Sequence, residues 1–239
     1  FTSNKILFKD VPIKKNSDGE YIFYDKVNEF YYLTNKYTSK ELDERLDSQV
    51  KFFNNLNKKG IDVNIYIPTR YEFTTLKKDN LSNYVGEFVS KLDSNINVRV
   101  MDVKSIDEYK EYFYKTDHHW NYKGSYKAYT EVLNLLDVNN PVKNDSEVCL
   151  NKSFSGSKAS ASVFNKIMKD DFCAYKFDFS SLDISVNGEK KDYGAQSEFF
   201  NNTTNLKINY GNFYGGDDGE IIFKNNDILS NDNLLVIGE

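Results

Sequence analysis

Apolar residues recur along residues 38–136 with two alternating periods, one typical of helices and the other of strands. Helical spacing places apolar residues on one face, whereas strict alternation makes one face of a sheet apolar. The expected elements, in chain order, are a helix from Thr38 to Gly60, a strand over 61–67, a helix near 80–92, a strand over 96–100, a short helix after Ser105 and a helix over 122–136. Helices and strands that alternate in this order predict an α/β fold with a mainly parallel sheet covered by helices.

Capping residues set the expected ends of the helices. Thr38 with Glu41, and Ser105 with Glu108, have the spacing of a capping box, in which side chains satisfy the unpaired amides of the first turn. Gly60 is expected to end the first helix, because glycine tolerates the left-handed conformation found there.

The two ends of the chain have a different pattern. Residues 1–37 are aromatic and strand-like, with a turn signal over 16–19. Beyond residue 141 the expected elements are a helix over 160–168, strands over 174–179, 182–186, 206–210 and 220–224, and a hairpin turn at Asn187-Gly188. Residues 234–237 form a continuous apolar run, as in a buried central strand. No repeat or linker interrupts the pattern, so we expect a single domain over 1–239. We expect it to be C-terminally incomplete, because this strand leads directly to the last residue.

Composition narrows the classes of function. The 239 residues carry 31 Lys and Arg against 36 Asp and Glu, a net charge of −5, with no basic block of the kind that binds nucleic acid. No run approaches the roughly 20 apolar residues of a membrane span. Cys149 and Cys173 are either a disulfide or two buried thiols. With 18 Tyr and 18 Phe, the chain could line a cleft that suits the apolar faces of sugar rings.

The main candidates for catalytic residues lie at the two histidines of the chain, which are adjacent in Thr116-Asp117-His118-His119-Trp120-Asn121. Histidine is the usual general base near neutral pH, and acyl transfer needs a carboxylate that orients it. An acid two residues before the imidazole reaches the ring when the backbone is extended or turns. The alternative for a bare Asp-x-His is a surface loop with a helix-capping Asp.

The wider sequence around this motif resembles the DHHW protein family, which is named after it. Residues 114–124, Tyr-Lys-Thr-Asp-His-His-Trp-Asn-Tyr-Lys-Gly, carry the signature. Residues 18–23 resemble an early Asp-Gly-x-aromatic-aliphatic-Phe element, and residues 60–70, ending Ile-Pro-Thr-Arg, resemble the family's first central strand. Residues 234–239 resemble the strand that leads into a Gly-Asp-Ser-aromatic nucleophile turn. The resemblance therefore spans nearly the whole chain in order.

The family is similar to the alginate O-acetylation proteins of the AlgX and AlgJ type. The resemblance implies an SGNH-hydrolase-like, flavodoxin-like three-layer sandwich with a circularly permuted motif order. It also implies that Asp117 is the orienting acid, His119 the general base and Gly238 the glycine before the nucleophile. Glu239 stands where the family more often has Asp, and the expected serine would be the next residue.

Five further residues are candidates for substrate or oxyanion contacts, and Gly238 is one of them. Arg70 ends a predicted parallel strand, where ligands bind in open α/β sheets, although a surface ion pair is the alternative. Asn212 lies in a glycine-rich stretch that offers oxyanion donors or is a plain hairpin loop. Ser155 lies in a stretch, 154–157, that resembles another family loop. His118 is either a catalytic residue or an exposed neighbour of the site. Trp120 and Asn121 are expected to pack against and cap the following helix.

The leading interpretation is a carbohydrate O-acetyltransferase or esterase with a Ser-His-Asp triad. Two alternatives remain open. A metal-dependent phosphoesterase would use Asp117, His118 and His119 as ligands, but the chain has no third histidine and its cysteines lack paired spacing. A non-catalytic cell-surface carbohydrate-binding or assembly protein would have a decayed site.

The expected partners follow from the leading interpretation. They are a polysaccharide or glycan acceptor and an acyl donor, with no nucleic acid, no cofactor and no metal. The resemblance further implies an extracytoplasmic, cell-surface domain whose membrane anchor lies outside this chain.

Overall fold

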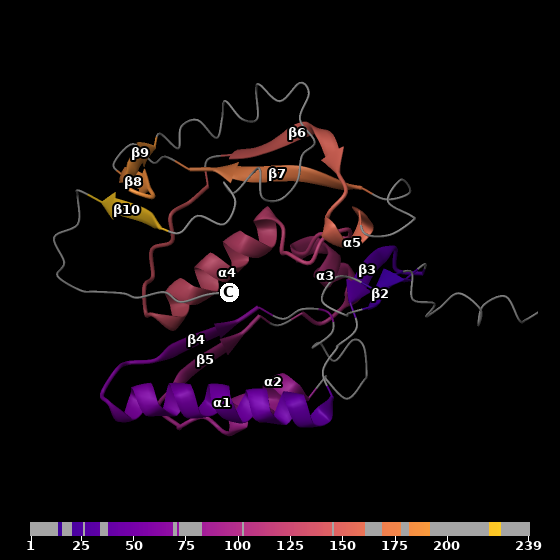
Figure 1. The fold of residues 1–239 in the computed structure, drawn as a ribbon. Coiled ribbons are helices and arrows are strands. Elements are labelled where there is room, and N and C mark those ends of the chain that lie inside the picture. Colours follow the sequence, from indigo (N-terminus) through magenta and orange to yellow (C-terminus); the bar gives the residue numbers. More distant parts are fainter. Residues whose placement is uncertain are drawn as a thin grey trace, which may run out of the picture.

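The computed structural model describes residues 14–15, 21–25, 27–33, 38–68, 71, 83–101, 103–144, 146–160, 169–177, 182–191 and 220–225. Within them the fold mixes helices with four small sheets of two or three strands (Figure 1). The described helices include none that is both long and apolar enough to cross a membrane.

The lower part of the molecule is a parallel strand pair covered by two helices (Figure 1). The strands are β4 (Asn64–Ile67) and β5 (Asn97–Val100), and the helices are α1 (Ser39–Lys58) and α2 (Tyr84–Ser90). Their shared apolar core is formed by Leu46, Val63, Ile65, Phe88 and Ile96. The predicted capping box and the left-handed Gly60 are both present. Among the described residues β4–β5 is the parallel pair, whereas the strands of the other three sheets pair antiparallel, and the predicted strand over 234–237 lies outside the described residues.

Two further helices lie above this unit and carry the site (Figure 1). They are α3 (Ile106–Tyr112) and α4 (Tyr122–Leu135). As predicted, the Ser105 hydroxyl accepts from the Glu108 amide, but the Glu108 carboxylate accepts from the Lys104 amide and so does not complete a box. Glu131 of α4 ties this layer to β4, because its nearly buried carboxylate accepts a 2.7 Å hydrogen bond from the Tyr66 hydroxyl.

An antiparallel pair forms the top of the molecule (Figure 1). It consists of β6 (Ser146–Phe154), which the sequence pattern did not predict, and β7 (Asp170–Lys176), which begins four residues before the predicted strand at 174. Cys149 and Cys173 face each other across the two strands and form a disulfide, so of the two alternatives left open by the sequence the structure selects the bridge. The short helix α5 (Ser157–Ser160) follows β6, and the remainder of the predicted helix over 160–168 lies outside the described residues.

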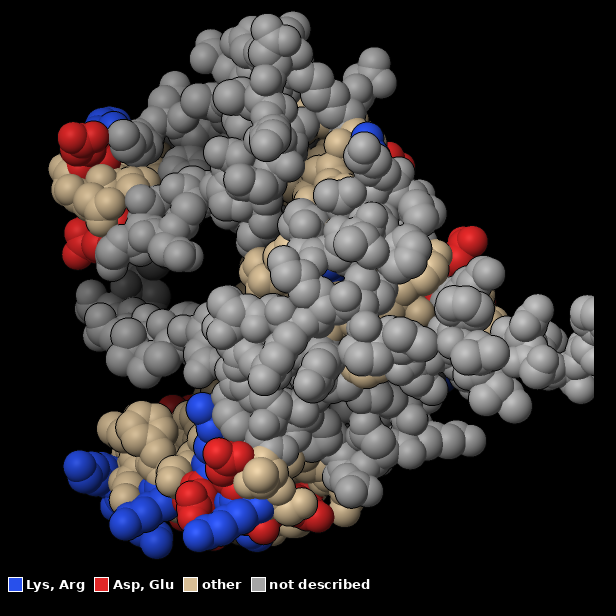
Figure 2. Space-filling model, turned by 45° about the vertical axis from the view of Figure 1, so that its right-hand side comes forward, with Lys and Arg blue, Asp and Glu red and all other residues tan. Residues whose placement is uncertain are grey.

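Two small antiparallel sheets complete the described fold. One contains β1 (Lys14–Lys15), β2 (Tyr21–Asp25) and β3 (Phe30–Leu33), and the other contains β8 (Leu182–Val186), β9 (Glu189–Lys191) and β10 (Ile221–Asn225). Asn187 and Gly188, with φ of 51° and 80°, form the predicted turn between β8 and β9. On the face shown in Figure 2, basic and acidic side chains mix over the end of the molecule that contains α1.

Candidate active site

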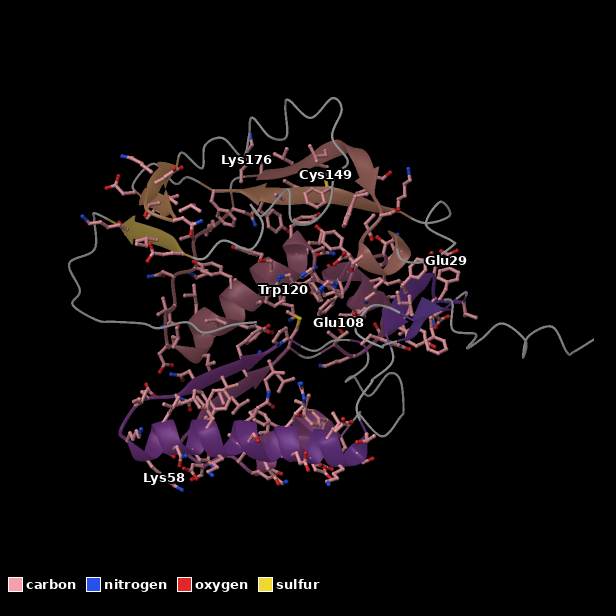
Figure 3. The ribbon with its side chains drawn as sticks, viewed as in Figure 1. Glu29, Lys58, Glu108, Trp120, Cys149 and Lys176 are labelled. Atoms are coloured by element: carbon pink, nitrogen blue, oxygen red, sulfur yellow. A yellow bond between two sulfur atoms is a disulfide. The ribbon has the colours of Figure 1, made fainter. Side chains whose placement is uncertain are left out.

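The Asp-His-His-Trp motif lies on the loop between α3 and α4, which we call the site loop (residues 113–121). Its base is closed by pairing of Phe113 with Trp120 and by a hydrogen bond from the Asn121 amide to the Tyr112 carbonyl. Asn121 also caps α4, as predicted, since its side-chain oxygen accepts from the first-turn amides. Trp120 lies in the middle of the molecule, between the β6–β7 pair and the β4–β5 pair (Figure 3).

Two apolar clusters hold the site loop from opposite sides. Phe113 belongs to the cluster of β3, α3 and α4, whereas its neighbour Tyr114 packs with Phe154 and Phe172 of β6 and β7. Phe113 is extended, with φ of −123° and ψ of 149°, so successive side chains point in opposite directions. The loop is therefore anchored where the α-helical layer meets the β6–β7 pair.

The site loop brings Asp117 and His119 together. The imidazole Nδ1 of His119 lies 2.5 Å from Asp117 Oδ1, and the same oxygen accepts from the His119 backbone amide at 3.1 Å. An ionised carboxylate only accepts hydrogen bonds, so Nδ1 carries the proton and Nε2 carries the basic lone pair. The predicted contact between the acid and the imidazole two residues later is thus present.

Asp117 is buried, with 3% of its side chain exposed, yet its environment favours the ionised form. Burial raises the pKa of its carboxyl, but the hydrogen bonds from His119 and from the Ser157 amide, with the electrostatic attraction of both neighbouring imidazoles, hold that pKa well below its usual range. The Ser157 amide donates to Oδ2 at 2.6 Å, so each carboxylate oxygen has a donor. The imidazole of His119 is 35% exposed, so solvent reaches part of the ring.

A second buried carboxylate, Asp170 at the start of β7, holds the residues before Asp117. It accepts from the amides of Lys115 and Thr116 at 3.0 and 2.8 Å and from the Thr116 hydroxyl at 2.5 Å. The Thr116 hydroxyl in turn accepts from the Gly156 amide at 2.9 Å. Nothing in the sequence pattern pointed to Asp170, because it is distant along the chain and belongs to no motif.

His118 points to a different partner from His119. Its Nδ1 lies 2.8 Å from the Ser157 hydroxyl and 3.4 Å from Asp117 Oδ1, and 43% of its side chain is exposed. The two imidazole rings are 3.8 Å apart between centroids. Ser157 was not among the sequence candidates, although the neighbouring Ser155 was. Ser155 itself follows β6 beside Gly156 and is half-buried.

The described residues contain two clusters whose ligand atoms are close enough for a metal ion. One is Asp117 with His118 and His119, and the other includes Cys149 and Cys173. The second cannot bind through its sulfurs, because they form the disulfide. In the first, the hydrogen bond between His119 Nδ1 and the carboxylate leaves that ring only Nε2, on the side away from Asp117, to bind a metal ion, so the acid and this imidazole cannot share one ion while the bond is present. The arrangement suits a hydrogen-bonded acid–base pair better than a metal centre.

Three of the sequence candidates cannot be placed against this pair. Arg70, Asn212 and Gly238 lie outside the described residues, as does the predicted strand that precedes the expected nucleophile. Their roles stay predictions.

Comparison with known proteins supports the fold. Three solved structures share it over most of the chain. PatB1 of Bacillus cereus with a sulfonyl adduct has a TM-score of 0.62 and 15% identity, covering 90% of this chain and 77% of that one. Another structure of Bacillus cereus PatB1 has a TM-score of 0.60 and 16% identity over 88% of this chain and 77% of that one. A DHHW family protein from Eubacterium siraeum DSM 15702 has a TM-score of 0.56 and 18% identity over 89% and 73%.

Sequence comparison alone gives no relative. No protein-family model matches the chain. No curated protein sequence matches it significantly. The structural neighbours include a DHHW family protein, as the resemblance of the motif led us to expect.

Proposed function

We propose that the protein is an O-acetyltransferase-like enzyme of carbohydrate, or an esterase, in which Asp117 and His119 are the acid and base of a Ser-His-Asp triad. The observation that carries the proposal is the hydrogen-bonded Asp117–His119 pair, with the acid buried and the imidazole half-exposed. The fold shared with PatB1 and a DHHW protein supports it. An SGNH-like three-layer sandwich, with the AlgX-type motif order, is part of the same proposal.

The proposed reaction has two steps. The serine hydroxyl attacks the carbonyl of an acyl donor, its proton passes to His119 Nε2, and the leaving group takes that proton as the acyl-serine forms. A sugar hydroxyl, or water, then attacks the acyl-serine and is deprotonated by the same imidazole, the bond between the acyl carbon and the serine oxygen breaks, and the imidazolium returns the proton to the serine. Asp117 keeps Nδ1 protonated and stabilises the imidazolium of each step. Arg70, His118, Ser155, Asn212 and Gly238 remain proposed substrate or oxyanion contacts.

The proposed nucleophile is a serine that follows Gly238-Glu239 in the complete protein. The described residues offer one competitor, because the Ser157 hydroxyl contacts an imidazole, that of His118. Two features disfavour it. The imidazole nitrogen that Ser157 contacts is also the one nearest Asp117, so the carboxylate cannot lie behind it as in a triad. The adjacent buried carboxylate also opposes a developing negative charge on the serine oxygen.

We further propose that the domain is extracytoplasmic and held at the cell surface. The Cys149–Cys173 disulfide supports this placement, because disulfides persist in oxidising compartments and are rare in the cytosol. The proposed partners are a glycan acceptor and an acyl donor.

Turnover of p-nitrophenyl acetate by the complete protein tests the function. His119→Ala and Asp117→Asn should each lower kcat by roughly 10³–10⁴-fold, as expected when a triad loses its base or its orienting acid. Asp171→Asn, on an exposed neighbouring position of β7, is the matched control and should retain wild-type activity. Activity within threefold of wild type in His119→Ala would exclude the triad.

Labelling with phenylmethylsulfonyl fluoride, followed by peptide mass spectrometry, identifies the nucleophile. Adduct on the serine after Glu239, absent in His119→Ala, supports the proposal. Adduct on Ser157 would move the nucleophile to α5. If the protein gives no adduct and no turnover but still binds glycan, the result favours the non-catalytic binding protein.

A further inference from the structure

We propose that Asp170 is a positioning residue for the triad acid, acting through Thr116. This inference rests on the proposed function, because it concerns how Asp117 is kept in place for His119. It goes beyond the triad by assigning a role to a carboxylate that lies 53 positions after the acid and touches neither imidazole among the described contacts.

The site loop cannot fix Asp117 by itself. The backbone hydrogen bonds that close the loop lie at its base, from the Tyr114 amide to the His119 carbonyl and from Asn121 to Tyr112. At the tip, the described contacts give Lys115 and Thr116 no hydrogen-bond partner within the loop, and Asp117 has only His119 and the imidazole of His118. Their contacts come from other elements, so the position of the acid depends on those elements.

Asp170 supplies acceptors for the tip of the loop. Its carboxylate accepts from two successive amides and one hydroxyl of the loop, all within 3.0 Å, and it is 5% exposed. These donors belong to the two residues that precede Asp117. Hydrogen bonds to a charged acceptor are stronger than neutral ones, so the carboxylate fixes the direction in which the chain enters Asp117.

Both strands of the β6–β7 pair take part in holding the acid. Thr116 donates its hydroxyl proton to Asp170 of β7 and accepts from the Gly156 amide after β6. The next amide, that of Ser157, donates to Asp117 itself. Phe154 and Asp170 are paired across the two strands, so the groups that hold Thr116 and Asp117 come from one end of one sheet. Movement of either strand end would move the acid.

Asp170→Asn is the direct test, in the complete protein. The amide nitrogen of Asn must face at least one of the loop donors, so one hydrogen bond becomes a donor–donor contact. We expect kcat to fall about 10- to 100-fold, as for a small misplacement of a catalytic group, with KM within twofold of wild type. Asp171→Asn, at the adjacent exposed position, should be unchanged in both constants.

Substitutions at Thr116 test the same contact from the loop side. Thr116→Val keeps the shape but removes the hydroxyl, and should reproduce the loss in kcat. Thr116→Ser restores the hydroxyl and should return activity to within about threefold of wild type. A loss that Ser fails to rescue would show that packing of the methyl group, not the hydrogen bond, matters.

Proton NMR of protein labelled with ¹⁵N-histidine separates positioning from stability. The chain has two imidazoles, and His118→Gln assigns them. Wild type should show a downfield, exchange-protected Nδ1 proton of His119, which Asp170→Asn and Thr116→Val broaden or remove. An unchanged resonance and unchanged kcat, with lower stability alone, would overturn the inference. If wild type lacks turnover but the resonance still responds to Asp170→Asn, the proposed function fails and the positioning role stands.

Discussion

Gly156 offers a sharp test of how tightly the candidate acid is packed. A methyl group added there would lie 2.6 Å from Asp117 Oδ2 and 2.7 Å from Asp117 Cα, well inside the contact distance of about 3.5–4.0 Å between carbon atoms. One of these atoms is backbone, so a rotamer change cannot relieve the overlap. Gly156→Ala must therefore displace either the site loop or the chain that joins β6 to α5.

The expected cost follows from the contacts that are disturbed. Overpacking of a buried position costs about 1–3 kcal/mol. The hydrogen bond from the Ser157 amide to the Asp117 carboxylate, next to the overlap, contributes about 1.5–3 kcal/mol because its acceptor is charged. The lower entropy of the unfolded chain with Ala offsets about 0.4–1 kcal/mol. We expect the free energy of unfolding to fall by about 2–5 kcal/mol, and kcat by about 10²-fold, since an acid displaced by about 1 Å no longer orients the imidazole.

Gly86 provides the matched control, because the same substitution has the opposite expected sign there. A methyl group at Gly86, within α2, would meet only the Asn83 side chain at an ordinary 3.5 Å. Gly86→Ala should stabilise the protein by about 0.5–1 kcal/mol through helix propensity. Urea unfolding followed by circular dichroism, together with ester turnover, measures both variants. Wild-type stability and activity in Gly156→Ala would refute the packing argument.

Three further predictions concern charge and covalent linkage. The pKa of Asp117 is lowered, so its contribution to the unfolding free energy is present above the usual Asp range and is lost as pH falls below that range. The pKa of Asp170 is raised, chiefly by burial, so its contribution to the unfolding free energy falls as pH rises. Urea titrations at several pH values give the slope of the unfolding free energy against pH. Asp117→Asn and Asp170→Asn should change this slope in opposite directions, and changes of the same sign would contradict the assignment. Reduction of Cys149–Cys173, whose partners are 24 residues apart, should lower the unfolding free energy by about 3.5 kcal/mol, seen as a shift of the urea midpoint with dithiothreitol. Glu131→Gln should lower the unfolding free energy by about 1–3 kcal/mol in the same assay, because a nearly buried carboxylate with hydroxyl, ammonium and guanidinium partners loses its charge. No measurable change would mean that these partners are solvated in the folded protein.

The elements that the sequence predicted well are those with strong local signals. The helix from Thr38 has a capping box at one end and a left-handed Gly60 after the other, and its structure differs from the prediction by a residue or two. The turn at Asn187-Gly188 is likewise determined by two adjacent residues. Periodicity and capping depend on neighbours in sequence, which is why they can be read without a fold.

The strand β6 was missed because its signal is weak. Polar residues interrupt its apolar ones, and the register with β7 shifts between Cys149 and Ser153, so no clean alternation remains. The start of β7 was missed for a related reason, since Asp170 and Asp171 look like loop residues. Burial of Asp170 depends on donors from a loop more than 50 positions earlier, which no local pattern contains.

The site was predicted in the same uneven way. The contact of Asp117 with His119 followed from their spacing, because an acid two residues before an imidazole reaches it in a turning loop. Asp170 of β7 and the amide of Ser157, which follows β6, fix this acid. Only the tertiary structure identifies these two partners.

A catalytic acid of this kind must be both ionised and immobile, and the two requirements conflict when it lies on a loop. Burial gives rigidity but disfavours charge, so the charge has to be stabilised by donors that are themselves fixed. Here those donors are supplied by the β6–β7 pair, and Cys173 lies three positions along β7 from Asp170, joined to Cys149 of the facing strand. The disulfide therefore constrains the same two strands that hold Thr116 and Asp117 in place. The disulfide stabilises the strands that hold the acid, and it forms in an oxidising environment. The proposed location of the protein is therefore connected to the geometry of its proposed site.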